Sequence, residues 1–525
     1  MSREIPSIDV SSWDSPLDDR ALSRLAEALP AYITTQRWYR AKARIIKDVR
    51  IQDVISMEQP GSFVAIVRID YRDHECDTYF LPLSAAEGLG AEPVARLRSP
   101  DGSERVLQGA LSRPDFRESL LEAIACDSHF HGKNGLLAAS RNQALHYECN
   151  LTGQKLESFV SRAEQSNSSL IFGDRFILKV FRKLEPGINP DLEIGRFLTA
   201  RGFKYTPAVL GELEYRPTQG EPMHAGILQA FVRNQGDAWK FTLESLKLFF
   251  ELALQNGTAP ELPSYHPMDL HGEEISALAR QTIGEYLEAA RLLGVRTAQM
   301  HAALADPDGG PDFAPEKFTP DFAHRLHAEM LNQAETTFDL LRDKQNTLPG
   351  SAGESARQLI AAEKKVRERF SSVRDHAVTA VRIRHHGDYH LGQVLYTGED
   401  FIIIDFEGEP ARPMAERRIK TLAMRDVAGM ARSFSYAAYA ALEPATRDKT
   451  EPWAAFWAAW VAAVYLKGYF ETAQTSAFAN STEDERRLLF DVFTMQKALY
   501  EISYELNNRP DWVQIPLQGI LNLIG

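Results

Sequence analysis

The sequence predicts an α+β fold in which a strand-rich N-terminal part precedes a largely helical C-terminal part. Alternating apolar and polar residues, rich in β-branched and aromatic types, recur between residues 45 and 232. After residue 273, apolar residues instead recur at steps of three and four, which is typical of helices. A short hairpin inside this helical part carries Asp388 and Asp405, and it is the most informative segment of the chain.

The first 133 residues are predicted to form a separate α+β cap domain. A helix is expected over residues 18–35, and a basic, aromatic run follows at 36–44. The alternation that follows predicts strands, and residues 115–125 predict a closing helix. The predicted strands cover residues 49–51, 63–69, 78–81, 92–97 and 104–108.

Two further parts follow the cap. Residues 134–234 predict a small β-rich lobe with strands at 156–163, 169–173, 176–181 and 223–232 and a helix at 191–201. Residues 235–525 predict a helical lobe that contains the hairpin. Its expected helices cover residues 273–305, 319–341, 354–378, 416–441, 453–472 and 483–507.

Composition excludes several classes of function. The chain has 525 residues, 44% of them hydrophobic, so a sizeable core is expected. A net charge of −13 argues against a nucleic-acid partner. Three dispersed cysteines and an N-terminus without an apolar run predict a reducing, cytoplasmic location. The most apolar segment, 453–469, is interrupted by Lys467 and predicts a buried helix and no membrane partner.

The hairpin brings acidic and amide side chains together. Asp388 follows His386 in a polar loop, and Gln393 precedes a short strand at 394–396. A turn at 397–400 and a buried strand at 401–404 follow, and Asp405 ends that strand. Because a hairpin folds its two ends together, these three oxygen-bearing side chains are expected to converge. Oxygen donors without thiolates suit Mg²⁺.

This order resembles the kinase pattern His-x-Asp-x-x-x-x-Asn followed by Asp-Phe-Gly, with Gln393 and Glu407 replacing the asparagine and the glycine. The resemblance implies a bilobal, protein-kinase-like fold of the small-molecule branch. It makes Asp388 the base for the attacking hydroxyl, with His386 beside it, and Gln393 and Asp405 the metal ligands. The alternative is an acidic turn beside a buried strand.

ATP is the expected cofactor besides Mg²⁺. Lys179 lies within an apolar strand and resembles the kinase lysine that contacts the nucleotide phosphates, with Glu193 as its helix partner. The glycine-rich loop is absent, and the small polar residues Ser166, Asn167 and Ser168 take its place. The expected hinge toward adenine comprises Gln229, Phe231 and Val232, and Asp237 opens the helical lobe. An edge-strand lysine and a plain hairpin turn are the alternatives.

Several separated motifs resemble the bacterial maltokinases. These motifs are His-His-Gly-Asp-Tyr-His-Leu-Gly-Gln-Val at 385–394, Ile-Asp-Phe-Glu-Gly-Glu-Pro at 404–410, Gln-Arg-Trp-Tyr-Arg-Ala-Lys at 36–42, and the segments at 165–168 and 235–239. The resemblance implies ATP-dependent phosphorylation of maltose at its anomeric hydroxyl. The product would feed α-glucan and glycogen metabolism, and an association with a trehalose or glucan enzyme is implied. The family also has an N-terminal cap.

The acceptor contacts are predicted from residues near the hairpin. Glu407, Glu409, Arg412, Arg425 and Asp426 follow the metal aspartate, and Trp457 lies on an aromatic stripe. A charged helix face and a packed core are the alternatives for these residues. Other acceptors, such as glucosamine or an aminoglycoside, define a second enzyme hypothesis. A non-catalytic pseudokinase or scaffold is a hypothesis of a different class.

Overall fold

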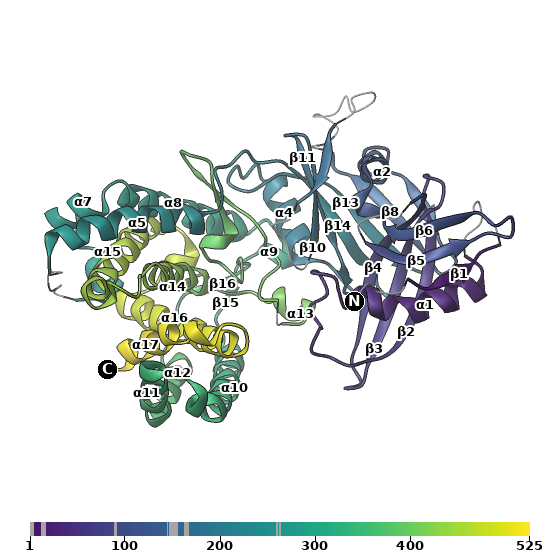
Figure 1. Ribbon diagram of the computed structural model, residues 1–525. Coiled ribbons are helices and arrows are strands. Elements are labelled where there is room, and N and C mark those ends of the chain that lie inside the picture. Colours follow the sequence, from purple (N-terminus) through teal and green to yellow (C-terminus); the bar gives the residue numbers. More distant parts are fainter. Residues whose placement is uncertain are drawn as a thin grey trace. The chain divides into compact units, whose positions relative to one another are not determined.

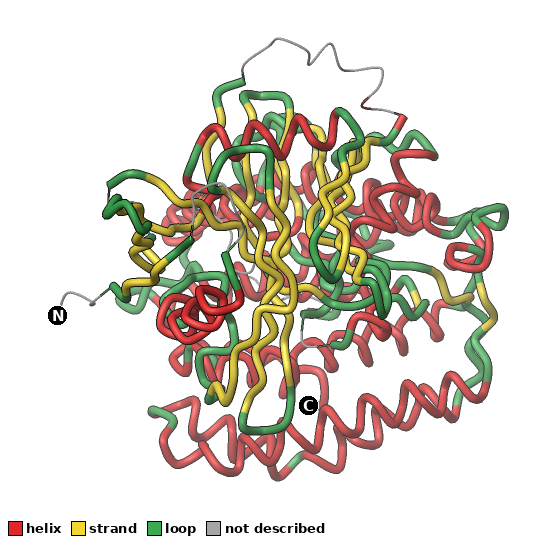
Figure 2. The backbone as a smooth tube through the Cα atoms, turned by 90° about the vertical axis from the view of Figure 1, so that its right-hand side faces the viewer, coloured by secondary structure: helices red, strands yellow, loops and turns green. Residues whose placement is uncertain are grey.

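The structure is a computed structural model that describes residues 5–11, 17–88, 92–143, 145, 156–161, 167–258, 261, 264–410 and 412–525. The described chain forms two compact units (Figure 1). One comprises residues up to Ala200 together with Pro207–Arg233, and the other comprises Arg201–Thr206 and Asn234–Gly525. Figure 2 shows the strands in yellow and the helices in red, and the long helices belong to the second unit.

The first sheet of the N-terminal unit is built from the predicted cap segments. Its strands run in the order β1-β5-β6-β4-β3-β2. Helix α1 (Asp19–Ile33) begins at Asp18, whose side chain accepts a hydrogen bond from Ala21 N, and α2 (Pro114–Ala125) begins at a proline. The strands are β1 (Ser7–Asp9), β2 (Ile46–Ser56), β3 (Ser62–Tyr71), β4 (Cys76–Ala86), β5 (Pro93–Arg98) and β6 (Glu104–Gly109).

A second sheet in the same unit corresponds to the predicted small lobe, with strand order β7-β8-β13-β14-β11-β10-β9. Helix α4 (Pro190–Ala200) contacts β13. The strands are β7 (His129–His131), β8 (Gly135–Arg141), β9 (Ser158–Val160), β10 (Asn167–Phe172), β11 (Phe176–Phe181), β13 (Val209–Pro217) and β14 (Met223–Ala230).

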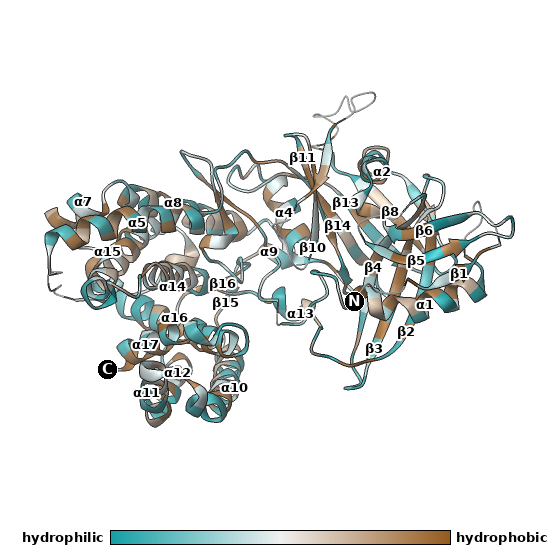
Figure 3. Ribbon diagram, in the orientation of Figure 1, coloured by the Kyte–Doolittle hydropathy of each residue, from teal (hydrophilic) through white to brown (hydrophobic). Residues whose placement is uncertain are grey.

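The two sheets share one hydrophobic core. Ile66 and Phe80 of the first sheet and Phe172 and Leu178 of the second sheet belong to the same buried cluster. In Figure 3 the brown stretches on β3 and β4 mark this apolar character. Burial of apolar side chains from both sheets in one cluster stabilises them as a single body, because the hydrophobic gain scales with the apolar area removed from water.

Three further contacts join the sheets. Strand β12 (Lys183–Leu184) pairs antiparallel with β4. Buried Asp53 of β2 accepts hydrogen bonds from the backbone of Lys133 and from the hydroxyl of Tyr215. The guanidinium of Arg182 lies 5.2 Å from the ring centre of Trp38, which belongs to the basic, aromatic run of the cap.

The C-terminal unit is mainly helical. Its long helices are α5 (Ala238–Asn256), α8 (Tyr286–Leu304), α10 (Pro320–Lys344), α14 (Met424–Ala440), α15 (Arg447–Ala473) and α16 (Glu483–Asn508). Shorter helices include α7 (Ala277–Ile283), α11 (Gly350–Ala361), α12 (Glu363–Asp375) and α17 (Gln514–Ile524). No described helix combines the length and the apolar run that crossing a membrane requires.

Helices α8 and α15 approach each other closely at two glycines. A Cβ atom on Gly294 would overlap with the carbonyl oxygen of Tyr465, and a Cβ atom on Gly468 would overlap with that of Arg291. Only glycine removes the side chain that would hold the two backbones apart. The α8–α15 pair therefore depends on these two positions.

The predicted α+β class and most elements are confirmed, and the differences have local causes. Strand β13 and helix α5 were not predicted. The predicted helix over 273–305 is split at Gly284, which has φ of +63°. The predicted helix over 416–441 is also interrupted. Helix α13 (Met414–Arg417) ends early because β19 (Thr421–Leu422) pairs with β16 (Val381–Ile383) before α14 begins.

Candidate functional site

The predicted hairpin is present in the C-terminal unit. Strand β17 (Val394–Tyr396) pairs antiparallel with β18 (Phe401–Ile403), and Val394 lies opposite Ile403. The carbonyl oxygen of Gln393 accepts a hydrogen bond from Ile404 N at 3.0 Å, which ties the two ends together. Asp405 follows with φ of 68°, a left-handed conformation that is uncommon for a residue other than glycine. Such backbone strain concentrates at functional sites.

His386 holds the loop before β17 in place. The residue is 1% exposed, and its Nε2–H donates to the carbonyl of Ile404 at 2.9 Å. The Nδ1 atom therefore accepts, and it faces the backbone N–H of Asp388 at 3.4 Å. His386 thus joins this loop to the end of β18 and positions it, and its predicted catalytic role stays a prediction.

Asp426, near the start of α14, anchors the same loop. Its oxygens accept hydrogen bonds from the backbone N–H groups of His386 at 2.7 Å and Gly387 at 3.0 Å, and from His301 Nε2 at 3.0 Å. Burial raises the pKa of this carboxyl. The hydrogen bond with His301 and the neighbouring histidines lower the pKa by more than burial raises it, so the pKa is well below its ordinary value. The oxygens of Asp426 therefore hold the loop, and its predicted acceptor contact stays a prediction.

Asp388 forms an ion pair that the sequence did not reveal. Lys497 Nζ of α16 lies 2.8 Å from Asp388 Oδ1. Burial raises the pKa of Asp388, yet the charge of Lys497 and its hydrogen bond lower it to a net value below the ordinary one. Burial lowers the pKa of Lys497, but the charge and the hydrogen bond of Asp388 raise it above the ordinary lysine value. Both groups are therefore charged at neutral pH.

A cavity opens beside this ion pair. Gly387, Asp388 and Tyr389 of the loop line it together with Glu409, Arg425 and Asp426. The remaining lining residues lie on α10, α14 and α16 and are Gln333, Gly429, Phe493, Gln496, Lys497 and Tyr500. Tyr500 follows Gln496 by four residues and Lys497 by three, so the three side chains lie on one face of α16. Sequence reasoning did not select these three residues.

An adjoining cavity contains the predicted arginines. It shares Gly387, Glu409 and Arg425 with the first cavity and adds Arg412 and Glu329. Arg412 Nε lies 2.7 Å from Glu409 Oε2 and also pairs with Glu329, and Arg425 lies 3.4 Å from each carboxylate. Burial raises the pKa of Glu329, but Arg412 and Arg425 lower it to about 2. Glu409, Arg412 and Arg425 thus line this cavity, and their contacts with an acceptor stay predictions.

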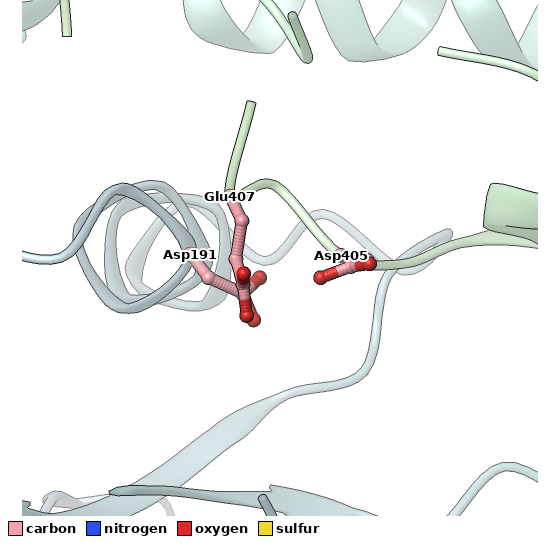
Figure 4. A group of neighbouring side chains, drawn as sticks. All are labelled: Asp191, Asp405 and Glu407. Atoms are coloured by element: carbon pink, nitrogen blue, oxygen red, sulfur yellow. The ribbon is translucent and has the colours of Figure 1, made fainter. Parts of the chain in front are cut away.

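Two carboxylates provide a candidate magnesium site in this unit. Asp405 and Glu407 lie on the segment after β18 (Figure 4), and their oxygens are within 4.8 Å of each other. Hard oxygen donors on neighbouring residues fit Mg²⁺, which binds through one or two carboxylates and substrate phosphates. The geometry places Glu407 beside the metal aspartate, whereas the sequence suggested an acceptor contact for it. The metal role of the Gln393 side chain stays a prediction.

Lys179 is buried in the N-terminal unit, as predicted from its apolar strand neighbours. It is 8% exposed, and its Nζ lies 3.3 Å from Asp191 Oδ2 and 5.8 Å from the ring centre of Phe181. Asp191, in the first turn of α4 (Figure 4), is itself 1% exposed and was not selected from the sequence. Glu193 lies in the same turn, and its pairing with Lys179 stays a prediction.

The predicted phosphate turn is only partly described. Ser166 lies outside the described residues, whereas Asn167 and Ser168 begin β10. The hydroxyl of Ser168 accepts a hydrogen bond from Arg182 Nε at 2.9 Å and is 9% exposed. Since Arg182 also contacts Trp38, this end of β10 is connected to the cap. The predicted phosphate contacts stay predictions.

The expected hinge residues follow β14. Gln229 pairs with Val209 and Ile177 within the sheet, and Phe231 N donates to the carbonyl of Arg175 at 2.8 Å. That N–H is therefore already bonded within the unit, so a hydrogen bond between Phe231 and adenine would have to use the carbonyl oxygen of Phe231. The predicted contact at Val232 stays a prediction. Asp237 caps α5 by accepting a hydrogen bond from Lys240 N at 2.8 Å, which explains its position without a ligand.

The predicted acceptor contact at Trp457 is wrong. Its side chain is 0% exposed, and the ring centres of Tyr286 and Phe434 lie 5.1 Å and 6.4 Å from it. An aromatic stripe at helical spacing faces the core because α15 is covered by other helices of its unit. Trp453 and Trp460, on the same stripe, are also buried.

The C-terminal arrangement suits proton acceptance at a bound hydroxyl. Asp388 lines a cavity, is ionised, and is held by the loop that His386 and Asp426 organise. A weakly basic carboxylate suffices when the hydroxyl proton leaves late, as in phosphoryl transfer. Lys497 brings a positive charge to the same place, where it would stabilise negative charge on transferring oxygens.

Comparisons with known proteins agree with this fold. The model of the maltokinase N-terminal cap domain matches residues 32–111. A glucosamine kinase of Streptacidiphilus jiangxiensis is 23% identical over 510 residues, covering 95% of this chain and 97% of that protein. A glucosamine kinase of Mycolicibacterium smegmatis is 24% identical over 359 residues, covering 67% of this chain and 76% of that protein.

Solved structures give the same result. The structure of a glucosamine kinase in complex with glucosamine, ADP and inorganic phosphate is 21% identical, with a TM-score of 0.61 and coverage of 95% of this chain and 99% of that chain. Another crystal form of glucosamine kinase is 20% identical with a TM-score of 0.63, and the match covers 96% of this chain and 99% of that chain. At these identities the likeness shows the fold, and it confirms the kinase-like α+β class with an N-terminal cap.

Proposed function

We propose that this protein is an ATP- and Mg²⁺-dependent sugar kinase that phosphorylates the anomeric hydroxyl of maltose, giving maltose 1-phosphate. The observation that carries the proposal is Asp388, ionised and lining a cavity. The maltokinase cap match and the similarity to kinases over 95% of the chain support phosphotransfer. The product would feed α-glucan and glycogen synthesis, in association with a trehalose or glucan enzyme.

Charge in the cavity favours a neutral sugar. The carboxylates of Asp388, Glu409 and Asp426 are already bonded to cations or backbone N–H groups. Lys497 and Arg425 at the same wall are the cations that pair with Asp388 and Glu409. The ammonium group of glucosamine would therefore find its candidate carboxylate partners already engaged, whereas the hydroxyls of maltose need no such partner.

The adjoining cavity favours an acceptor with two rings. It shares the lining residues Gly387, Glu409 and Arg425 with the first cavity and is rich in paired arginines and glutamates. Such polar groups hydrogen-bond sugar hydroxyls. The first ring would place its anomeric hydroxyl at Asp388, and the second ring would occupy the adjoining cavity.

Glucosamine is the second candidate acceptor. Two curated relatives are glucosamine kinases, and one of them matches 95% of this chain. Their identities of 23% and 24% leave room for a different acceptor. Nucleotide binding is supported by buried Lys179 and its ion pair with Asp191.

An acceptor panel tests the proposal. The protein is incubated with ATP, Mg²⁺ and maltose, glucosamine, glucose or kanamycin, and products are followed by phosphorus NMR, with Asp388→Asn as the inactive control. We expect maltose 1-phosphate and at least ten-fold lower turnover of glucosamine. Preferred turnover of glucosamine would replace the maltose assignment, and no turnover of any acceptor would favour a non-catalytic scaffold.

A further inference from the structure

A second, larger cavity lies in the helical unit, away from Asp388. Its volume is about 710 Å³, within the usual range for sites that bind small molecules. Helices α14, α15, α16 and α17 form its walls, with Ser264–Pro267 at one side. On α16, Phe490, Thr494 and Ala498 line this cavity, whereas Gln496, Lys497 and Tyr500 line the acceptor cavity. The two cavities therefore lie on different faces of one helix.

The walls of this cavity are mostly apolar. Alanines from three helices supply much of the surface, and Phe490 and Ile515 add larger apolar groups. Ala431, Ala459, Ala462 and Ala498 are each at most 6% exposed, so the cavity reaches into the packed helices. Exposed Tyr265 and Arg369 also line it, so the cavity is open to solvent on one side.

A buried arginine inside the cavity lacks one hydrogen bond. Arg432 is 4% exposed, and its Nε donates to Glu501 at 2.9 Å. Its Nη2 is buried and has no hydrogen-bond partner among the described residues, and the same holds for Thr494 Oγ1. An unsatisfied buried donor on a charged group is costly, so an acceptor from a ligand would be stabilising there.

Positive charge is also available at the wall. Arg369 lines the cavity and makes no ion pair with any described residue. Arg487 is paired with Asp269, and Asp491 lies 2.6 Å from His266. Arg432 is paired with Glu501, so Arg369, at an exposed position, is the lining arginine that makes no ion pair among the described residues.

We propose that this cavity binds a small organic anion with an apolar body, whose anionic oxygen accepts from Arg432 Nη2 and whose body packs against the alanines. The site is independent of the proposed acceptor. It contains no residue that lines the cavity at Asp388. A neutral molecule would satisfy Nη2 without using the charge of Arg369.

Calorimetric titration with octanoate tests this site, with octan-1-ol and octylamine as probes of the same chain length. We expect octanoate to bind and to bind at least ten-fold more tightly than octan-1-ol or octylamine. No binding of octanoate, or equal binding of the three probes, would overturn the proposal.

Variants locate the binding. Ala458→Phe fills the cavity and should weaken octanoate at least ten-fold, whereas Ala361→Phe, at an exposed position outside it, should not. Arg432→Lys keeps the charge beside Glu501 but removes Nη2, and it should weaken octanoate about five-fold. Binding to Ala458→Phe that equals binding to the unchanged protein would overturn the proposal, provided that thermal unfolding shows the variant folded.

Discussion

Lys497 Nζ lies 2.8 Å from Asp388 Oδ1 and 4.8 Å from the ring centre of Tyr500. The lysine therefore joins helix α16 to the catalytic loop and sets the charge at the candidate base. Burial raises the pKa of Asp388, because a charged carboxylate is disfavoured away from water, and Lys497 is the largest of the groups that lower it. With the lysine, the carboxylate stays ionised.

Lys497→Met should shift the pH dependence of catalysis. In the unchanged protein the pKa of Asp388 is below its ordinary value, so the acid limb of kcat/KM lies at low pH. Removing Lys497 takes away the largest group that opposes burial and leaves only His390 and His386 to lower the pKa of Asp388, which moves the limb to higher pH, and kcat should fall roughly ten-fold or more. Lys364→Met, at a highly exposed position on α12, serves as the control. An acid limb of kcat/KM that does not move in Lys497→Met would exclude the electrostatic role of Lys497.

Asp388→Asn should abolish most transfer while leaving the fold intact. The amide keeps the shape of the side chain but cannot accept the hydroxyl proton, so kcat should fall by about 10²–10⁴-fold. Circular dichroism and the affinity for ATP, measured with each purified protein, should stay close to those of the unchanged protein. Turnover within about ten-fold of normal would remove Asp388 from the role of base.

Asp426→Asn should destabilise the protein in a pH-dependent way. The carboxylate holds three donors, and its pKa is lower in the folded than in the unfolded chain. Its contribution is therefore present above the unfolded-state pKa, about 3.9, and is lost as pH falls through the folded-state value. The variant should lose about 3 kcal/mol at pH 7.

Urea denaturation at neutral and acidic pH measures this effect. The gap in unfolding free energy between the unchanged protein and Asp426→Asn should narrow as the pH is lowered below about 4. Asp308→Asn, at an exposed loop position, is the matched control and should change little. A difference in unfolding free energy that stays constant with pH would contradict the conclusion that an ionised Asp426 holds the loop.

Magnesium should act through Asp405 and Glu407. Chelation of Mg²⁺ should abolish turnover, and Asp405→Asn and Glu407→Gln should each raise the Mg²⁺ concentration needed for half-maximal activity by about ten-fold or more. Glu399→Gln, in the exposed turn of the same hairpin, should leave that concentration unchanged. An unaltered Mg²⁺ requirement in Glu407→Gln would return Glu407 to the predicted acceptor role.

Gly294→Ala should weaken the contact between α8 and α15. A Cβ atom there overlaps with a backbone carbonyl, which cannot move aside as a flexible side chain can. The expected loss is about 1–3 kcal/mol, measured by thermal unfolding. Gly272→Ala is the control, because a Cβ atom at that exposed position meets nothing within 4 Å.

The hairpin could be predicted from sequence because the residues that define it are close together in the chain. Two short apolar strands flank a turn, and the order of Asp388, Gln393 and Asp405 defines their placement. Lys497 could not be predicted, because it is 109 residues from Asp388 and lies in an ordinary amphipathic helix. Asp191 and Glu193 both occupy the first turn of α4, and only the fold decides which one is buried against Lys179.

Trp457 shows the limit of residue type as a guide. Its helical spacing is more often that of a core residue but also fits a sugar platform, and packing of α15 against Tyr286 and Phe434 decides for the core. The cap was predicted as a separate part, yet its sheet shares a core with the next sheet. Apolar alternation reports that a strand face is covered, but it does not report what covers it.

That shared core limits how this architecture can be cut or recombined. Removing the first 133 residues would expose Phe172 and Leu178 to water, and the remaining sheet would then tend to aggregate. A fragment able to fold alone would instead extend to about residue 233, where the compact unit ends. Chimaeras that exchange the helical unit between relatives should therefore place the crossover near residue 233, so that both sheets stay together.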